Sequence, residues 1–136
     1  MSQNLTLEVV TPEKELLETS ADYVTVPGSF GELGILPGHL PVLTSLKSGV
    51  LSYKSGEEQK KFAIHYGFAE VCKDKITVLA TEAEVGSDID LAQAQSDQKS
   101  AQAELEKAVK ESLDNEIIEG LQKSVSISIT RQDAAK

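Results

Sequence analysis

The chain has 136 residues, of which 40% are hydrophobic, 26% are charged and only 4% are aromatic. This length and composition fit one folded domain or a small domain with an appendage, and they exclude a multidomain enzyme and a wholly disordered chain. The net charge of −9 disfavours nucleic acid and anionic lipid surfaces as partners, because both repel an acidic protein.

The sequence contains no apolar run long enough to cross a bilayer, and its first residues, MSQNLTLEVV, lack the basic and apolar regions of a signal peptide. We therefore expect no direct membrane insertion and no export. Cys72 is the single cysteine, which excludes an internal disulfide and suits a reducing compartment. We interpret it as a small buried hydrophobic residue.

Up to about Thr81, apolar residues recur at every second position, which is the period of β-strands. Examples are Leu5, Leu7 and Val9, then Phe62, Ile64 and Tyr66, then Ile76 and Val78. Turn residues separate these runs at Pro27-Gly28, Pro37-Gly38, Ser55-Gly56 and Lys73-Asp74. Many short strands predict a flattened β-sandwich or barrel.

From Ser87 the apolar period becomes helical. One stripe contains Leu91, Ala94, Ala101, Leu105 and Ala108, and a second contains Ile118, Leu121, Val125 and Ile129. A break at residues 112–115 separates the stripes and predicts an antiparallel two-helix hairpin. The segment SVSISIT, residues 124–130, alternates like a strand, but the second stripe continues through it, so we predict helix.

We place the domain boundary in TEAEVGSD, residues 81–88, where the period changes. The prediction is a mainly β plus α fold, with a β-sandwich at residues 1–84 and a C-terminal helical hairpin at 87–136. Ser87 and Asp90 have the spacing of a capping box at the start of the first helix.

Signatures of catalysis and of metal binding are nearly absent from the sequence. His39, His65 and Cys72 are the candidate soft ligands, and no two of them have the spacing of a zinc motif. We therefore predict no catalytic residues and no metal site, and a metal-dependent enzyme built on these three residues stays an alternative.

The stretch GELGILPGHLP, residues 31–41, concentrates glycine and proline within an apolar run. Pro37 and Gly38 occupy the positions that a type II turn requires. We interpret the stretch as a rigid loop between strands, or alternatively as a docking surface that presents Glu32 and His39, since a stiff loop loses little entropy on binding.

The run GELGILPGHLPVLTSLKSGVL, residues 31–51, resembles the signature of the epsilon subunit of bacterial F-type ATP synthase. The likeness extends over the whole chain, through LTLEVVTPEKELL, YGFAEV, ITVLATEAE and the two-helix tail. It implies a non-catalytic central-stalk subunit that couples rotation of the catalytic head to the membrane c-ring during proton-driven ATP synthesis.

This resemblance also implies partners for particular residues. Glu32, at the tip of the 28–33 loop, would face the c-subunit ring, while His39, Leu40, Pro41 and Thr44 would lie toward the gamma subunit. The hairpin would fold against the sandwich or extend into the alpha/beta catalytic head, where it restrains ATP hydrolysis. The location implied is the cytoplasmic face of the bacterial inner membrane.

Some members of this family bind ATP at the hairpin through the motif Ile/Leu-Asp-x-x-Arg-Ala. Here Asp90 and Ala94 match it, but Gln93 replaces the arginine that suits phosphate charge. We therefore expect no obligatory cofactor and treat ATP as a weak candidate regulatory ligand. A nucleotide-sensing β-sandwich that works apart from the synthase is the alternative function.

Overall fold

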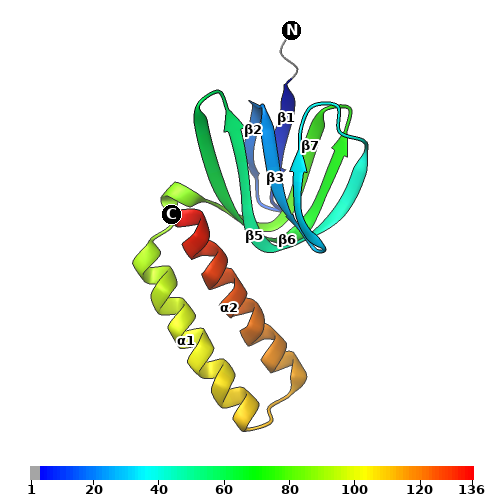
Figure 1. Ribbon diagram of the computed structural model, residues 1–136. Coiled ribbons are helices and arrows are strands. Elements are labelled where there is room, and N and C mark those ends of the chain that lie inside the picture. The colour runs from blue at the N-terminus through cyan, green and yellow to red at the C-terminus, as the bar shows by residue number, and fades with distance from the viewer. Residues whose placement is uncertain (1–3) are drawn as a thin grey trace.

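The structure is a computed structural model that describes residues 4–136. The prediction that the N-terminal segment is not a signal peptide lies partly outside these residues, since it includes residues 1–3. The described residues contain seven strands followed by two long helices (Figure 1). The strands are β1 (Leu5–Val10), β2 (Glu15–Ala21), β3 (Tyr23–Gly28), β4 (Gly31–Ile35), β5 (Val42–Ser55), β6 (Glu58–Cys72) and β7 (Lys75–Val85). A short 3-10 helix, η1 (Gly86–Asp88), then leads to α1 (Leu91–Lys110) and α2 (Asn115–Ala135).

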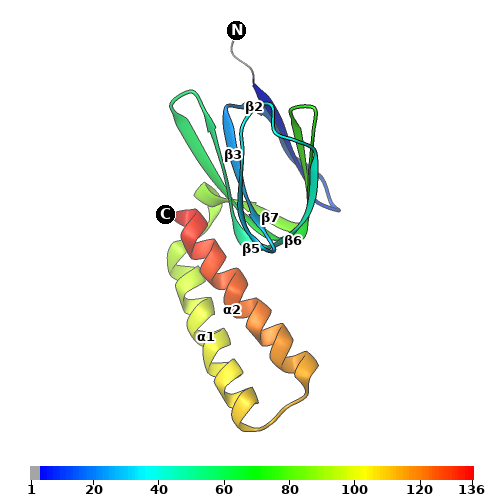
Figure 2. The same cartoon turned by 45° about the vertical axis from the view of Figure 1, so that its right-hand side comes forward.

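The strands form one hydrogen-bonded sheet in the order β2-β1-β7-β6-β5-β3-β4, which folds over so that its two arms face each other as the layers of a sandwich (Figures 1 and 2). β1 pairs parallel with β7, and the other neighbours are antiparallel. The space between the layers is filled by fully buried aliphatic side chains, including Leu5, Leu7, Val24, Val26, Leu51, Ile64, Ile76 and Val78. The predicted sandwich is therefore confirmed.

The three long strands β5, β6 and β7 each pass from one layer to the other. In β6 the core-facing residues are Phe62 and Ile64 before the crossing, and Ala69 and Val71 after it. A strand alternates its faces with a period of two, so this change from even to odd positions means that the strand turns over. The crossing lies at Tyr66 and Gly67, whose φ angles of 66° and 136° are both positive.

This crossing corrects one predicted core position, because Tyr66 is half-buried and does not continue the row of Phe62 and Ile64. β5 and β7 turn over at the same level of the sheet. In β5 the core-facing positions change from even at Leu46 to odd at Leu51, and in β7 they change from even at Ala80 to odd at Ala83. We call this level the bend of the sandwich.

The helical hairpin contacts the sandwich through the C-terminal part of α2 and the start of α1, and it projects away from the sandwich (Figure 1). The C-terminus of α2 and the start of α1 lie at the sandwich, whereas the turn between the helices lies at the far end (Figures 1 and 2). Both helices and the break between them agree with the prediction, and residues 124–130 are helical. The hydroxyls of Ser124 and Ser128 donate to the carbonyls of Gly120 and Ser124, so these polar groups are satisfied within the helix.

Two details at the helix starts and faces differ from the prediction. α1 begins at Leu91 with Asp90 as its N-cap, whose carboxylate accepts from the amide of Gln93 at 3.1 Å, so the capping box starting at Ser87 was wrong. Ser87 instead belongs to η1. On α2, Ile129 is exposed, and the buried side chains near it are Ser128 and Thr130.

Candidate functional site

The turn at residues 36–41 is held by hydrogen bonds and lies at the end of the sandwich opposite the hairpin (Figure 1). The amide of His39 donates to the carbonyl of Leu36 at 3.2 Å, and Gly38 has a φ of 85°, as the predicted turn requires. The amide of Gly38 also donates to the Asp74 carboxylate at 2.7 Å, which ties this turn to the β6–β7 turn. Leu40 is 79% exposed at its surface.

Glu32 and His39 do not belong to one loop. Residues 31–35 form strand β4, and Glu32 pairs there with Pro27, so the interpretation of the whole stretch as a loop was wrong. The turn before β4 is at Ser29 and Phe30, and Phe30 is fully exposed at its tip. β4 thus separates Glu32 at one end of the sandwich from His39 at the other.

Glu32 lies near the hairpin. It borders a depression of about 500 Å³ whose other walls include Pro27, Lys47 and the α2 residues Ile129 and Asp133. The carboxylate is exposed, so it is accessible to a partner at this end of the molecule.

Next to the turn at residues 36–41, the outer face of β5, β6 and β7 carries an apolar patch, which we define as Leu43, Phe68 and Leu79. Phe68 pairs with Leu79 on β7 and with Ser45 on β5, two residues from Leu43, so all three side chains share one face. Phe68 is 56% exposed and Leu43 is 70% exposed. A hollow of about 330 Å³ beside them is lined by Pro12, Gly67, Phe68 and Leu79.

The structure sorts the predicted gamma-facing residues into two groups. Leu40 and Pro41 are exposed next to the apolar patch, whereas His39 and Thr44 are half-buried. The Nδ1 of His39 donates to the carbonyl of Leu40 at 2.7 Å, and the Thr44 hydroxyl lies on the side of β5 that faces Gly28. The patch itself was not predicted from the sequence, since alternation alone does not tell which of two apolar neighbours points outward.

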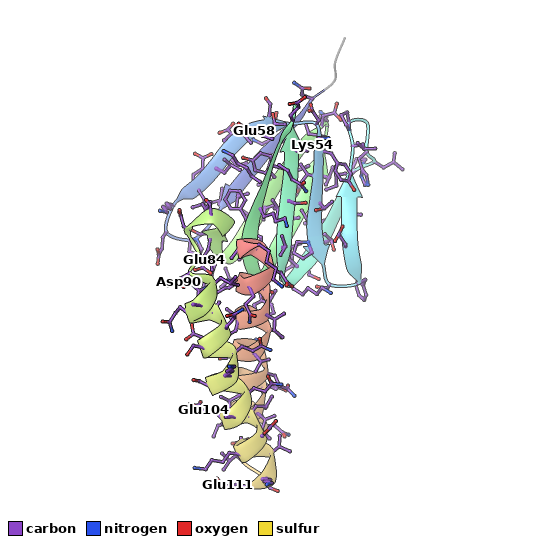
Figure 3. The ribbon with its side chains drawn as sticks, turned by 60° about the vertical axis from the view of Figure 1, so that its left-hand side comes forward. Lys54, Glu58, Glu84, Asp90, Glu104 and Glu111 are labelled. Carbon is purple, nitrogen blue, oxygen red and sulfur yellow. The ribbon has the colours of Figure 1, made fainter. Side chains whose placement is uncertain are left out.

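At the other end, the hairpin meets the sandwich through a polar network. His65 is 2% exposed, and its Nδ1 and Nε2 lie 3.2 Å from the Ser48 hydroxyl and 3.2 Å from a Glu84 carboxylate oxygen. The Ser48 hydroxyl is 2.8 Å from that of Thr130 on α2. Figure 3 shows Glu84 and Asp90 at this junction, with Lys54 and Glu58 at the opposite end of the sandwich.

Arg131 of α2 completes this network. Its Nε lies 3.0 Å from one Glu84 carboxylate oxygen and 3.2 Å from the other, and its Nη1 lies 3.5 Å from the Asp97 carboxylate on α1. The ammonium of Lys123 stands 5.3 Å from the centre of the Tyr66 ring. Burial raises the pKa of the Tyr66 phenol.

The residues of the candidate ATP motif all have structural contacts at this junction. Asp90 caps α1, the side-chain amide of Gln93 donates to Asp97 at 2.8 Å, and Ala94 is fully buried against Ala63 and Ala134. Arg131, which contacts Asp97 on the same helix as this motif, is already paired with two carboxylates. These contacts describe a helix start, and the nucleotide site remains a prediction.

The candidate soft ligands do not converge. His65 and Cys72 are seven positions apart on β6, which separates them by more than about 15 Å, too far to share one ion. Three acids of β1 and β2, Glu8, Glu15 and Glu18, do lie within 4.8 Å of one another. Side-chain hydrogen bonds to Glu8, and to a lesser extent to Glu18, raise the pKa of the Glu15 carboxyl.

The β-sandwich is the part of the chain that decides its family. The family model for the beta-sandwich domain of the ATP synthase delta/epsilon chain matches residues 4–86. This chain belongs to that family. The delta/epsilon match ends at η1, where the strands give way to the hairpin.

Curated relatives extend the delta/epsilon likeness into the hairpin. The ATP synthase epsilon chain of Desulfosudis oleivorans is 48% identical over 107 residues, covering 78% of this chain and 80% of the relative. That of Geobacter sulfurreducens is 40% identical over 119 residues, covering 88% and 86%. These relatives are named as one chain of a larger complex, which agrees with the prediction of a subunit that is not an enzyme acting alone.

Solved structures share the complete fold. A chain of the Euglena gracilis mitochondrial ATP synthase, in a structure with OSCP, F1 and the c-ring, is 20% identical and superimposes with a TM-score of 0.83, covering 98% of this chain and 82% of that one. A chain from the central stalk and c-ring of the Tetrahymena thermophila enzyme gives 0.64 at 19% identity, covering 99% and 98%. These likenesses show the fold of sandwich and hairpin together. No helix among residues 4–136 is long and apolar enough to span a membrane.

Proposed function

We propose that this chain is the non-catalytic epsilon subunit in the central stalk of an F-type ATP synthase. In this role the sandwich couples rotation of the catalytic head to the c-ring during proton-driven ATP synthesis, and the hairpin restrains ATP hydrolysis. The family match over residues 4–86 carries the proposal, since the relatives that share it are named as epsilon chains of this complex. The proposed location is the cytoplasmic face of a bacterial inner membrane.

The apolar patch supports a protein partner on the outer face of β5, β6 and β7, and we assign the gamma subunit to it. Leu43, Phe68 and Leu79 are exposed together, and the rigid turn with Leu40 and Pro41 continues this surface. Aromatic side chains at the centre of such surfaces often dominate binding energy. Glu32, at the opposite end of β4 and accessible to solvent, is assigned to the c-ring.

Phe68→Asp is expected to weaken binding to a catalytic head that contains gamma by at least about thirtyfold, since a buried anchor contributes about 2 kcal/mol or more. Titration of the purified head with labelled chain measures the effect. Phe30→Asp makes the same chemical change at a fully exposed side chain at the opposite end of β4 and serves as the control, with unchanged binding to a head that lacks the c-ring. Equal affinities for the parent chain and both variants would show that the gamma subunit does not bind the apolar patch.

Two features support the hairpin as the part that acts on the alpha/beta head. It projects beyond the sandwich (Figure 1). Its far end also exposes three apolar side chains, Val109, Leu113 and Ile117. Figure 3 shows acidic residues, Glu104 and Glu111, along the same distal half. The second helix has few bases, so we expect this contact to depend more on shape than on charge.

Removal of residues 87–136 is expected to accelerate ATP hydrolysis by the gamma-containing head several-fold relative to the full chain. The core of the sandwich consists of β-strand residues, so the truncated form retains the surface that binds the head. Phosphate release at saturating chain measures the rate, and binding of both forms is verified in the same samples. Equal rates with both forms bound would show that the hairpin does not restrain ATP hydrolysis, and only the coupling role of the sandwich would stand.

A further inference from the structure

The hairpin makes only a small apolar contact with the sandwich. This contact consists of Ala63, Ile89, Ala94 and Ala134, with Val50 and Ala135 at its edge. Burial of a methyl group contributes only about 0.8 kcal/mol, so a contact made mostly of alanines holds the hairpin weakly. The position of the hairpin must depend largely on the polar groups beside it.

The strongest polar contacts converge on Arg131. Its guanidinium pairs with Glu84 on β7 and with Asp97 on α1, so one side chain of α2 connects the sandwich with both helices. Arg131 is 23% exposed and Glu84 is 36% exposed, which leaves the pair partly desolvated and geometrically held. A charge-assisted contact with both carboxylate oxygens is stronger than an exposed ion pair.

We propose that Glu84, Arg131 and Asp97 form an ionic latch that holds the hairpin against the sandwich and that opens when its charge balance is lost or screened. The two helices stay paired when the latch opens, because they have contacts of their own, such as the 2.6 Å hydrogen bond between the side chains of Gln132 and Gln98. The latch is a property of the isolated chain and does not depend on its partners in the synthase.

Loss of Arg131 has two effects of the same sign. It removes the attraction to Glu84 and Asp97, and it leaves these carboxylates at the junction without their shared cation. Like charges that approach each other without a counter-charge repel, which favours separation of α1 from β7. His65 contributes from the sandwich side through its contact with Glu84, and Ser48 contributes through Thr130.

Energy transfer between two fluorophores on the full chain tests the latch. Cys72 is half-buried and not fully buried as predicted, so it supplies one attachment point on β6, and Gln102→Cys supplies a second on the exposed side of α1. In this background Arg131→Gln is expected to increase the low-transfer, released population at least about tenfold. Lys107→Gln, which removes an exposed charge from the last turn of α1, is the matched control and should leave transfer unchanged.

Salt provides a test that needs no change in the latch. Raising ionic strength from about 0.1 M to about 1 M shortens the Debye length from about 10 Å to about 3 Å. Transfer should then fall in the parent chain, and it should no longer respond in Arg131→Gln. Glu84→Gln should release the hairpin as Arg131→Gln does, and the double variant should add little to either.

The far-UV circular dichroism of each variant shows whether the helices persist. Retained helicity with reduced transfer supports release of an intact hairpin. Transfer that is insensitive both to salt and to Arg131→Gln would overturn the latch, and so would loss of helicity that accompanies every loss of transfer. Because no other subunit is present, a failed latch is distinguishable from a failed assignment to the synthase.

Discussion

Gly67→Ala is expected to lower the free energy of unfolding by about 3 kcal/mol or more. A Cβ at this position would lie 2.1 Å from the carbonyl oxygen of Leu79 and 2.9 Å from the Cα of Ala80, both of them backbone atoms of β7. The φ of 136° adds conformational strain for any residue with a Cβ. Urea unfolding followed by circular dichroism measures the change in midpoint.

Gly120→Ala is the matched control for this change. Gly120 lies inside α2, and a Cβ there meets no atom within 4 Å. Alanine is the better helix former, so this variant should gain about 0.5–1 kcal/mol. If Gly67→Ala unfolded at the same urea concentration as the parent chain, the turnover of β6 at residues 66–67 would not need glycine and our account of the bend would be wrong.

Gly86→Ala is expected to separate the hairpin from an intact sandwich. Gly86 is buried between two carbonyl groups, and a Cβ would lie 2.3 Å from the oxygen of Ala134 and 2.8 Å from that of Lys61. One oxygen belongs to the end of α2 and the other to β6, so relief of both clashes requires the hairpin to move. Overpacking of this kind costs about 1–3 kcal/mol. This cost is comparable to the free energy that the small apolar contact contributes to docking of the hairpin.

Hydrogen–deuterium exchange measures this separation segment by segment. Amides of α1 and α2 should exchange faster in Gly86→Ala, because helices that lose tertiary contacts are marginal in water. Amides of β1 and of β6 should keep the protection of the parent chain. Unchanged exchange in the helices would show that the junction adapts to a methyl group, and faster exchange throughout would show that the hairpin and sandwich unfold together.

The sequence predicted the two architectural parts well, because both depend on periodic apolar positions. Leu5, Leu7 and Val9 are buried as alternation requires, and Ala94 and Ala108 are buried on the helical stripe. Residues 124–130 show how tertiary context overrides a local preference, since Ser128 and Thr130 lie on different sides of α2 and both are buried within an alternating, β-branched run.

What the sequence did not predict depends on the bend. Alternation assumes that a strand keeps its faces, so it extended the core row from Ile64 to Tyr66, where the strand turns over. The same assumption concealed the apolar patch, whose members lie on strands with a core row on the opposite face. Ion pairs such as Arg131 with Glu84 join residues that are 47 positions apart, and no local pattern specifies such a pair.

The bend places the apolar patch and the hairpin contacts on the same three strands. Leu43 and Ser48 lie on β5, Phe68 and His65 on β6, and Leu79 and Glu84 on β7, so each strand carries one residue of either surface. If binding at one of these surfaces changes the affinity at the other, the coupling free energy is the same in both directions. A partner that binds the patch more tightly when the hairpin is released must therefore favour release by the same factor.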